Sequence, residues 1–301
     1  MSLAFDILLA FGVVFTAAAA LGTHDRVASI AGFVVTGLLV ALSLVRLGAP
    51  DVALAEAAIG AGLTGALLLR SAWRLKPAES RVSPPIEQII LALISVCASG
   101  ALAWAAYTAP GAALYPALVS ERLAESGVTN PVTAVLLNFR AWDTLLEIAV
   151  LFVALILVRI VAPAHPQPVV LGELMLPFAR IVVPMCAFLA GHLLWQGTSV
   201  PGGAFQAGAI LAGGLLVLML GGFAVPTPRL LSWGMMVALL GLAVFAVAAL
   251  STEALTGTLL LYPDGAAKIW ILMIEAVLTL SIAAMLCLLF CGMPRRPLND
   301  V

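Results

Sequence analysis

The segment 138–161, NFRAWDTLLEIAVLFVALILVRIV, decides the fold class. Between Glu147 and Arg159 it contains no polar side chain. A bilayer core is crossed by about 20 mostly apolar helical residues, and only helices and closed barrels satisfy every backbone hydrogen bond in lipid. The segment lacks the alternation of apolar and polar residues that barrel strands show. It therefore predicts a transmembrane helix with charged side chains towards one end.

The composition of the whole chain extends this interpretation. Of the 301 residues, 63% are hydrophobic and only 10% are charged, and the mean hydropathy is +1.17. An ordinary soluble domain is about 45–50% apolar and 25% charged, so most of this chain faces lipid or buried protein. The 14 Lys and Arg against 15 Asp and Glu give a formal net charge of −1, which argues against a nucleic-acid partner. We predict an all-α, polytopic transmembrane helical bundle.

Apolar runs of helix length recur along the chain and predict about nine spans. They cover residues 3–22, 27–45, 51–73, 86–107, 138–161, 174–195, 204–223, 229–250 and 268–291. The Pro-containing linkers 74–85 and 162–172 group these spans as three, two and four. We therefore expect three modules, at 1–76, 77–162 and 163–301.

Basic residues are distributed unevenly between the two expected sides of the membrane. One side carries nine of them, Arg26, Arg70, Arg74, Lys76, Arg81, Arg159, Arg229, Arg295 and Arg296, and the other carries four, Arg46, Arg122, Arg140 and Lys268. Cytoplasmic loops carry the excess of Lys and Arg in membrane proteins. We predict that the N-terminus lies outside and that the C-terminus is cytoplasmic.

Motifs for an enzyme or a cofactor are weak. Residues 60–65 match the G-x-G-x-x-G pattern, but this stretch lies inside an apolar helix, where small residues allow close helix packing and no dinucleotide pocket can form. Cys287 and Cys291 are four residues apart, yet no further Cys or His lies near them in sequence to complete a zinc site. No nucleophile–base set stands out, so we expect no independent catalytic site, cofactor or metal.

Ionisable residues inside the spans are the functional candidates. A charge at a helix centre costs roughly 2.5–3.5 kcal/mol on insertion scales, so such groups are paired or functional. Glu56 lies one to two turns into the third span, with Gly60 and Thr64 on the same face. We predict that Glu56 is an ion-relay residue, because a carboxyl group with little water around it can exchange protons near neutral pH. The alternatives are a structural interhelical hydrogen bond and a solvated residue at the membrane edge.

The fifth span carries a second group, Arg140, Asp143 and Glu147, on one helix face. Arg140 can pair with Asp143 at i, i+3. Asp143 and Glu147 repel one another if both are desolvated and ionised. We predict that Glu147 is a relay residue and that Asp143 is the partner of Arg140. The alternative is an ion pair at the helix entry that only fixes register.

Three further residues are secondary candidates. Arg180 in the sixth span and Glu275 in the ninth have no close partner in sequence, and opposite charges within one four-span module can pair. His192 lies near the outer end of the sixth span. It is either a proton relay, since imidazole titrates near neutrality, or a packed and hydrogen-bonded side chain.

Three segments resemble accessory modules of Mrp-type cation/proton antiporters and related membrane-bound hydrogenases. Residues 46–69 (RLGAPDVALAEAAIGAGLTGALLL) resemble the hydrogenase D-subunit family, and residues 138–158 resemble the hydrogenase E-subunit module. The two modules follow one another in the same order near the C-terminus of the large Mrp A subunit. Residues 187–220, which include GHLLWQGTSVPGGAFQAGAILAGGLLVL, resemble the four-helix Mrp B subunit.

The resemblance implies a membrane subunit of a multi-subunit monovalent cation (Na+)/proton antiporter in a prokaryotic inner membrane. Its partners would be large antiporter-like membrane subunits, other small Mrp subunits, lipid, and the transported proton and cation. The residues that the resemblance places on the ion path are Glu56 and the pattern Phe139, Arg140, Asp143, Thr144 and Glu147. Pro201, Gly202 and Gly203 would shape a helix entry. Many Mrp A subunits carry their acid one turn later, where this chain has Gly60.

Two alternatives stay open at this point. The first is a membrane-arm subunit of a complex I-like hydrogenase or another redox-driven ion pump, which would use the same relay. The second is a structural scaffold that seals larger subunits together and moves no ion.

Overall fold

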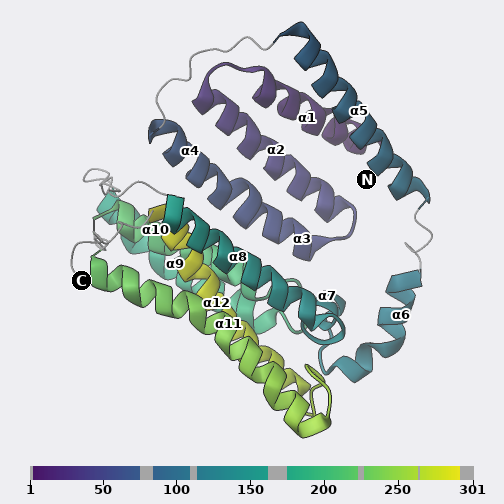
Figure 1. The fold of residues 1–301 in the computed structure, drawn as a ribbon, viewed down its shortest axis with the longest axis vertical. Coiled ribbons are helices and arrows are strands. Elements are labelled where there is room, and N and C mark those ends of the chain that lie inside the picture. The colour runs from purple at the N-terminus through teal and green to yellow at the C-terminus, as the bar shows by residue number, and fades with distance from the viewer. Residues whose placement is uncertain are drawn as a thin grey trace.

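All regular secondary structure in the described part of the chain is helical, which confirms the predicted all-α bundle (Figure 1). The computed structural model describes residues 3–74, 84–108, 114–161, 175–222, 227–263 and 265–291. The helices are α1 (Leu3–Gly22), α2 (Arg26–Arg46), α3 (Pro50–Ala55), α4 (Thr64–Arg74), α5 (Pro85–Thr108), α6 (Leu114–Arg122), α7 (Pro131–Ala134), α8 (Ala141–Val161), α9 (Met175–Gln196), α10 (Ala204–Leu220), α11 (Pro228–Thr256) and α12 (Ala267–Cys291).

Eight helices of the described residues are long and apolar enough to cross a membrane, where the sequence predicts about nine spans. The expected span at 204–223 is α10, an apolar helix of only 17 residues. It begins at residue 204 as predicted, directly after the non-helical Gly202 and Gly203, but it ends at Leu220, before the turn at Gly221 and Gly222. The orientation of the bundle stays a prediction from its basic residues.

The third span is one continuous helix whose middle part is π-helical instead of α-helical. Between α3 and α4, residues Glu56–Leu63 form a π-helical segment, η1. The Thr64 hydroxyl donates to the Ile59 carbonyl five residues earlier, at 2.8 Å. A second π-helical segment, η3 (Val135–Phe139), follows α7 and leads into α8. π-helical segments are rare in proteins, and those that occur often lie at functional sites.

The helices form two groups that meet along the third span (Figure 1). In the first group, α1, α2 and the span from α3 to α4 lie side by side. The second group contains α8 to α12, and α12 is its most deeply buried helix, in contact with α8, α9, α10 and α11. Helix α5 has no buried residue and lies at the periphery.

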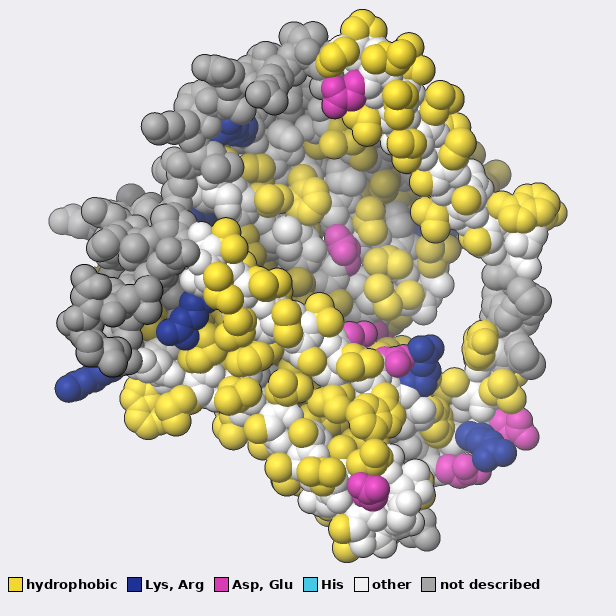
Figure 2. All heavy atoms as spheres, viewed as in Figure 1, with side chains coloured by type: hydrophobic (Ala, Val, Ile, Leu, Met, Phe, Trp, Pro, Cys, Tyr) yellow, Lys and Arg dark blue, Asp and Glu magenta, His cyan; other side chains and the backbone are white. Residues whose placement is uncertain are grey.

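The surface of the bundle is apolar across the faces of its helices. Figure 2 shows hydrophobic side chains over most of the visible face, with charged side chains mainly at the rims and around a hollow between the two groups. The exposed apolar residues of α5 and α8 include Ile89, Trp104, Val150 and Leu157. This distribution is the one that a lipid-facing or partner-facing surface requires.

Candidate functional site

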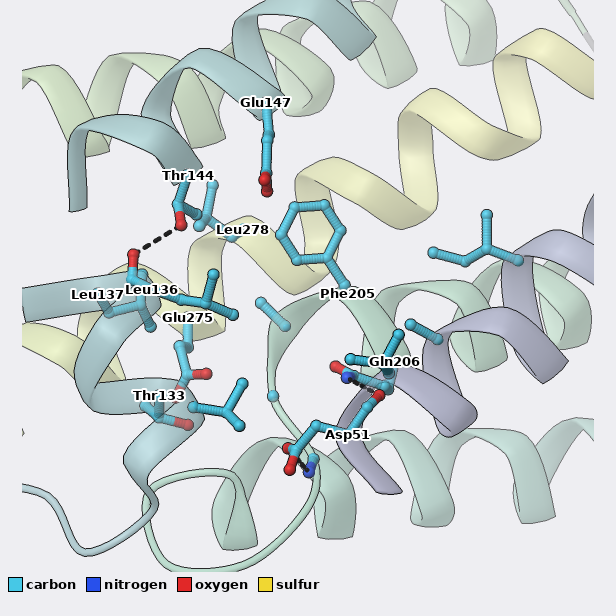
Figure 3. Close-up of a pocket in the computed structure, with 17 residues that line it drawn as sticks. Asp51, Thr133, Leu136, Leu137, Thr144, Glu147, Phe205, Gln206, Glu275 and Leu278 are labelled. Carbon is cyan, nitrogen blue, oxygen red and sulfur yellow. Dashed lines mark hydrogen bonds between the residues drawn. The ribbon is translucent and has the colours of Figure 1, made fainter. Parts of the chain in front are cut away.

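A pocket of about 270 Å³ lies where the first group of helices meets the second (Figure 3). Its polar lining comes from helices distant in sequence and consists of Asp51, Thr133, Thr144, Glu147, Gln206 and Glu275. The other lining residues are apolar side chains or glycines, and no Lys, Arg or His of the described residues lines it. The pocket is therefore an acidic chamber in an otherwise apolar bundle.

Asp51 ties the two groups together at one end of the pocket. It lies in the first turn of α3 and is only 6% exposed. Its Oδ1 accepts hydrogen bonds from the Gly202 amide at 3.2 Å and from Asn130 Nδ2 at 3.3 Å. Its own carbonyl accepts from Gln206 Nε2 at 3.0 Å, so this one residue contacts all three segments that build the junction.

Asn130 holds the same junction from the other side. Its Oδ1 accepts from the Val132 amide at 2.9 Å, which caps α7, and Pro131 takes the first helical position. Asn and Pro favour these positions because the cap satisfies a free amide and proline lacks one. The Nδ2 group also donates to the carbonyls of Gly197 and Val200, each at 3.1 Å. The loop between α9 and α10 is thereby fastened to the start of α7.

Glu275 of α12 is the most buried acid of the pocket, at 2% exposure. The Ala204 amide, at the start of α10, donates to its carboxylate. A helix N-terminus favours a negative charge. Its Oε2 has no hydrogen-bond partner among the described residues, and Figure 3 shows the carboxylate beside Thr133.

Gly203 makes room for this carboxylate. Its backbone has φ +115°, a conformation that favours glycine. A Cβ at this position would lie 2.9 Å from Glu275 Oε1. The predicted helix entry at Pro201, Gly202 and Gly203 thus lies at the pocket, and Gly202 and Gly203 are buried in its wall.

Glu147 of α8 occupies the other end of the pocket. Its side chain is exposed and points towards the Phe205 ring, which lies between Glu147 and Gln206 in Figure 3. Thr144, one turn earlier, is buried and donates to the Leu136 carbonyl of η3 at 2.6 Å. The π-helical segment therefore supplies the carbonyl that orients a pocket side chain.

The predicted pair of Arg140 and Asp143 is present. The two side chains form an i, i+3 ion pair and are 69% and 44% exposed. Neither residue lines the pocket, although Glu147 lies one turn beyond Asp143 and does.

Glu56 lies on another side of the third span from the pocket. Its half-buried carboxylate folds over Gly60 of the same segment and faces Gly37 of α2. It does not line the chamber that contains Glu147, although its neighbours Ala55 and Ile59 do. The two predicted relay residues are thus on separate faces of the junction.

Of the three secondary candidates, two lie away from the pocket and one lines it. Arg180 and His192 of α9 are exposed, and the His192 ring stacks on Phe188 with 6.5 Å between ring centroids. Within the described residues, Arg180 forms no ion pair with Glu275. Only Glu275 of this set lines the pocket.

Three polar residues of the pocket were not predicted as site residues from the sequence. They are Asp51, Thr133 and Gln206. Gln206 carried a usable signal, because it is the one polar side chain in the helix AFQAGAILAGGLLVLML. The signal for Asp51 was weaker, because an acid in a first helical turn is common for reasons of capping alone.

Tyr262, in the loop between α11 and α12, contacts η3 beside the pocket. Its hydroxyl donates to the Leu137 carbonyl of η3 at 2.8 Å, and its ring stacks on Trp270. Burial raises the pKa of this phenol.

Among the described residues, no three His, Cys, Asp or Glu side chains are close enough together to hold a metal ion.

Three family models match consecutive parts of the chain. They are MbhD, the D subunit of MBH, at residues 11–77, MbhE, the E subunit of MBH, at 80–167, and a domain related to the MnhB subunit of Na+/H+ antiporter at 175–292. Together these three matches support a fusion of MbhD-like, MbhE-like and MnhB-like domains. In these terms Asp51 comes from the MbhD domain, Glu147 from the MbhE domain and Glu275 from the MnhB domain.

Two known proteins are similar to the chain over most of its length. The chain is 28% identical over 264 residues to the probable K(+)/H(+) antiporter A/B subunit of Rhizobium meliloti (strain 1021), an alignment that covers 73% of this chain and 26% of that protein. Its fold matches the structure of the Mrp complex from Dietzia sp. DQ12-45-1b with a TM-score of 0.77 and 23% identity, covering 97% of this chain and 35% of that one. The chain thus spans about a quarter of the length of the Rhizobium meliloti protein.

Proposed function

We propose that this MbhD–MbhE–MnhB chain is a membrane subunit of a multi-subunit Mrp-type monovalent cation/proton antiporter. The observation that carries the proposal is the acidic pocket at the meeting point of its three domains, each of which contributes one carboxylate. The likeness to part of a K(+)/H(+) antiporter and to an Mrp complex supports the same conclusion.

Within this function the intramembrane carboxylates relay ions. Glu147 stands at the exposed end of the pocket and Glu275 at its buried end, so a proton or cation entering at one end meets a second acceptor inside. Glu56 contributes a separate carboxylate between η1 and α2. Arg140 and Asp143 position the start of α8 through their ion pair.

The chain acts as part of a larger assembly in the cell membrane. Its partners are large antiporter-like subunits and other small Mrp subunits, and lipid surrounds the apolar faces. The exposed apolar surface of α5 supports such a setting, because every residue of this helix is exposed. We assign the chain no catalytic site of its own.

A redox-driven pump is the second candidate, because the first two domains match subunits of MBH. The MnhB-related domain, which fills residues 175–292, favours the antiporter. The partner chains of the native complex separate the two: a redox arm co-purifies with iron–sulfur or nickel subunits, and an antiporter does not.

The test of the proposed function uses everted membrane vesicles that contain the whole complex. Adding NaCl or KCl to energised vesicles should release the proton gradient, and vesicles from cells that lack this chain should not respond. Glu56→Gln should reduce the response while the complex assembles normally, because the amide cannot exchange a proton. Full exchange without the chain would contradict the proposal.

A further inference from the structure

We propose that the buried part of the pocket, between Asp51, Gln206 and Glu275, binds a partly hydrated monovalent cation. This inference rests on the proposed function and gives the transported ion a place in the chain. It begins with Glu275, which is only 2% exposed and whose Oε2 has no hydrogen-bond partner among the described residues. A buried carboxylate without a compensating partner is costly, and a cation in the pocket would provide one.

The side chains around Glu275 offer their oxygen atoms to the pocket. Thr133, Thr144 and Gln206 each donate a hydrogen bond to a backbone carbonyl. The oxygen atoms of these three groups keep lone pairs. Asp51 accepts both of its hydrogen bonds at Oδ1, so its Oδ2 has no hydrogen bond within the described residues.

The backbone amides at the pocket wall are occupied as well. The Gly202 amide donates to Asp51, and the Ala204 amide donates to Glu275. The Gly203 amide donates to the Leu193 carbonyl at 3.0 Å. The pocket therefore presents mostly acceptors, an arrangement that suits a cation better than an anion.

The size and composition of the pocket select the class of cation. A volume of about 270 Å³ is several times the roughly 30 Å³ that one water takes in the liquid, so an ion can keep part of its hydration shell. The pocket has no thiolate or imidazole ligand, and the described acids do not form a three-ligand chelate. Ca²⁺ takes about 6–8 oxygen ligands and Mg²⁺ demands a near-ideal octahedron, whereas a monovalent alkali cation with bound water fits this looser arrangement.

Gly203 keeps the space between two of the ligands open. A Cβ at this position would lie 2.9 Å from Glu275 Oε1 and 3.6 Å from Gln206 Oε1. Both side-chain oxygens therefore face the same point on the backbone. A larger residue there would fill the place where the two oxygens converge.

The test measures how cations protect Glu275 from carbodiimide, which modifies protonated carboxyl groups in apolar surroundings. The whole complex in membrane vesicles is labelled at increasing NaCl or KCl, with choline chloride at equal ionic strength as reference, and the modified peptide is quantified by mass spectrometry. We expect NaCl or KCl to suppress labelling of Glu275, because a bound cation keeps its carboxylate ionised and covered. Choline chloride should leave the labelling unchanged.

Two variants sharpen the result. Asp51→Asn should raise the cation concentration that gives half protection by about tenfold, the change expected for losing one charged ligand. Glu253→Gln, which alters an exposed acid near the end of α11, should leave that concentration unchanged.

Equal labelling in NaCl, KCl and choline chloride would overturn the inference, and this wild-type measurement needs no variant to fold. A complex that exchanges cations for protons without protecting Glu275 would refute the site and leave the proposed function standing. Protection of Glu275 in a complex that exchanges nothing would support the site and refute the proposed function.

Discussion

At the scale of single residues, the junction depends on groups whose function lies in buried hydrogen bonds. Asp51 and Asn130 are 6% and 3% exposed, and they connect segments that are 79 positions apart. A buried polar group that loses its partner costs about 1–3 kcal/mol. The residues that hold the three domains together are therefore sensitive to small changes.

Asn130→Ala should lower the stability of the purified complex. The change removes the α7 cap and leaves Asp51 Oδ1 and the carbonyls of Gly197 and Val200 without this donor. We expect a loss of about 1–3 kcal/mol, measured as a lower thermal unfolding midpoint in detergent. Ser199→Ala in the same loop is the control, because Ser199 is exposed and its hydroxyl binds only a local carbonyl; an equal loss in both variants would contradict the assignment.

At the scale of elements, the π-helical segments change which side chains face which neighbour. Small residues recur every four positions in the third span, at Ala53, Ala57, Ala61 and Gly65. In a regular α-helix all four would lie on one face and could pack closely against a neighbouring helix. Ala53, Ala61 and Gly65 are buried, but η1 shifts the register between them, and Ala57 is only half-buried.

Gly60→Ala tests the place of Glu56 in this segment. A methyl group at residue 60 would occupy the space of the Glu56 carboxylate and force it to move. If Glu56 relays ions, cation-driven proton flux in vesicles should fall by roughly tenfold, the effect of about 1.4 kcal/mol on a barrier. Gly100→Ala on α5 has open space around it and should keep full flux; unchanged flux in both variants would remove Glu56 from the pathway.

The contact between α10 and α12 gives a matched pair of substitutions on one helix. A Cβ on Gly208 would lie 2.9 Å from Ile282, whereas a Cβ on Gly213 would have no neighbour within 4 Å. Gly208→Ala should destabilise the complex by about 1–3 kcal/mol through overpacking. Gly213→Ala should be neutral or stabilising by up to about 1 kcal/mol, because alanine is the better helix former. The thermal unfolding midpoints of the two variants measure this difference. A lower midpoint for Gly213→Ala than for Gly208→Ala would disprove the close packing of α10 against α12.

The loop between α11 and α12 predicts a dependence of stability on pH. Because burial raises the pKa of Tyr262 above its ordinary value of 10.0, the folded protein holds this proton more tightly than the unfolded chain does. The contribution of the phenol is complete below pH 10 and decreases as the pH rises above it, by about 1.4 kcal/mol per unit. Tyr262→Phe should be less stable at pH 8 by about 1 kcal/mol, for one lost hydrogen bond.

Chemical unfolding at pH 8 and pH 11 measures this difference. The gap between wild type and Tyr262→Phe should narrow or reverse at the higher pH. A constant gap across the range would show that the phenol titrates alike in both states.

Some of these elements can be predicted from the sequence, and others depend on how the helices pack. Long apolar runs such as 138–161 predict α8 and its neighbours, because hydropathy reports directly on contact with lipid. The pair of Arg140 and Asp143 follows from helical spacing alone. The contacts of Asp51 with Gly202 and of Glu275 with Ala204 do not, because they depend on how separate helices pack. The π-helical winding of η1 and η3 has no signature in the hydropathy pattern.

At the scale of the whole molecule, three domains fused in one chain meet at one pocket. Each contributes an acid, and the loop between α9 and α10 fastens the MnhB domain to the other two through Asn130 and Asp51. Fusion fixes the three domains at equal numbers and holds them at a high effective concentration. Under the proposed function, this arrangement would let the acids of the three domains act as one path.

Cation-driven proton flux in proteoliposomes that contain the purified complex tests most directly whether ions pass through the pocket. Glu147→Gln and Glu275→Gln remove the charge at the two ends of the same pocket, and Glu253→Gln removes an exposed charge outside it. Both pocket variants should assemble fully but lose most of their flux, while Glu253→Gln should keep it. Wild-type flux in fully assembled Glu147→Gln and Glu275→Gln complexes would contradict this prediction.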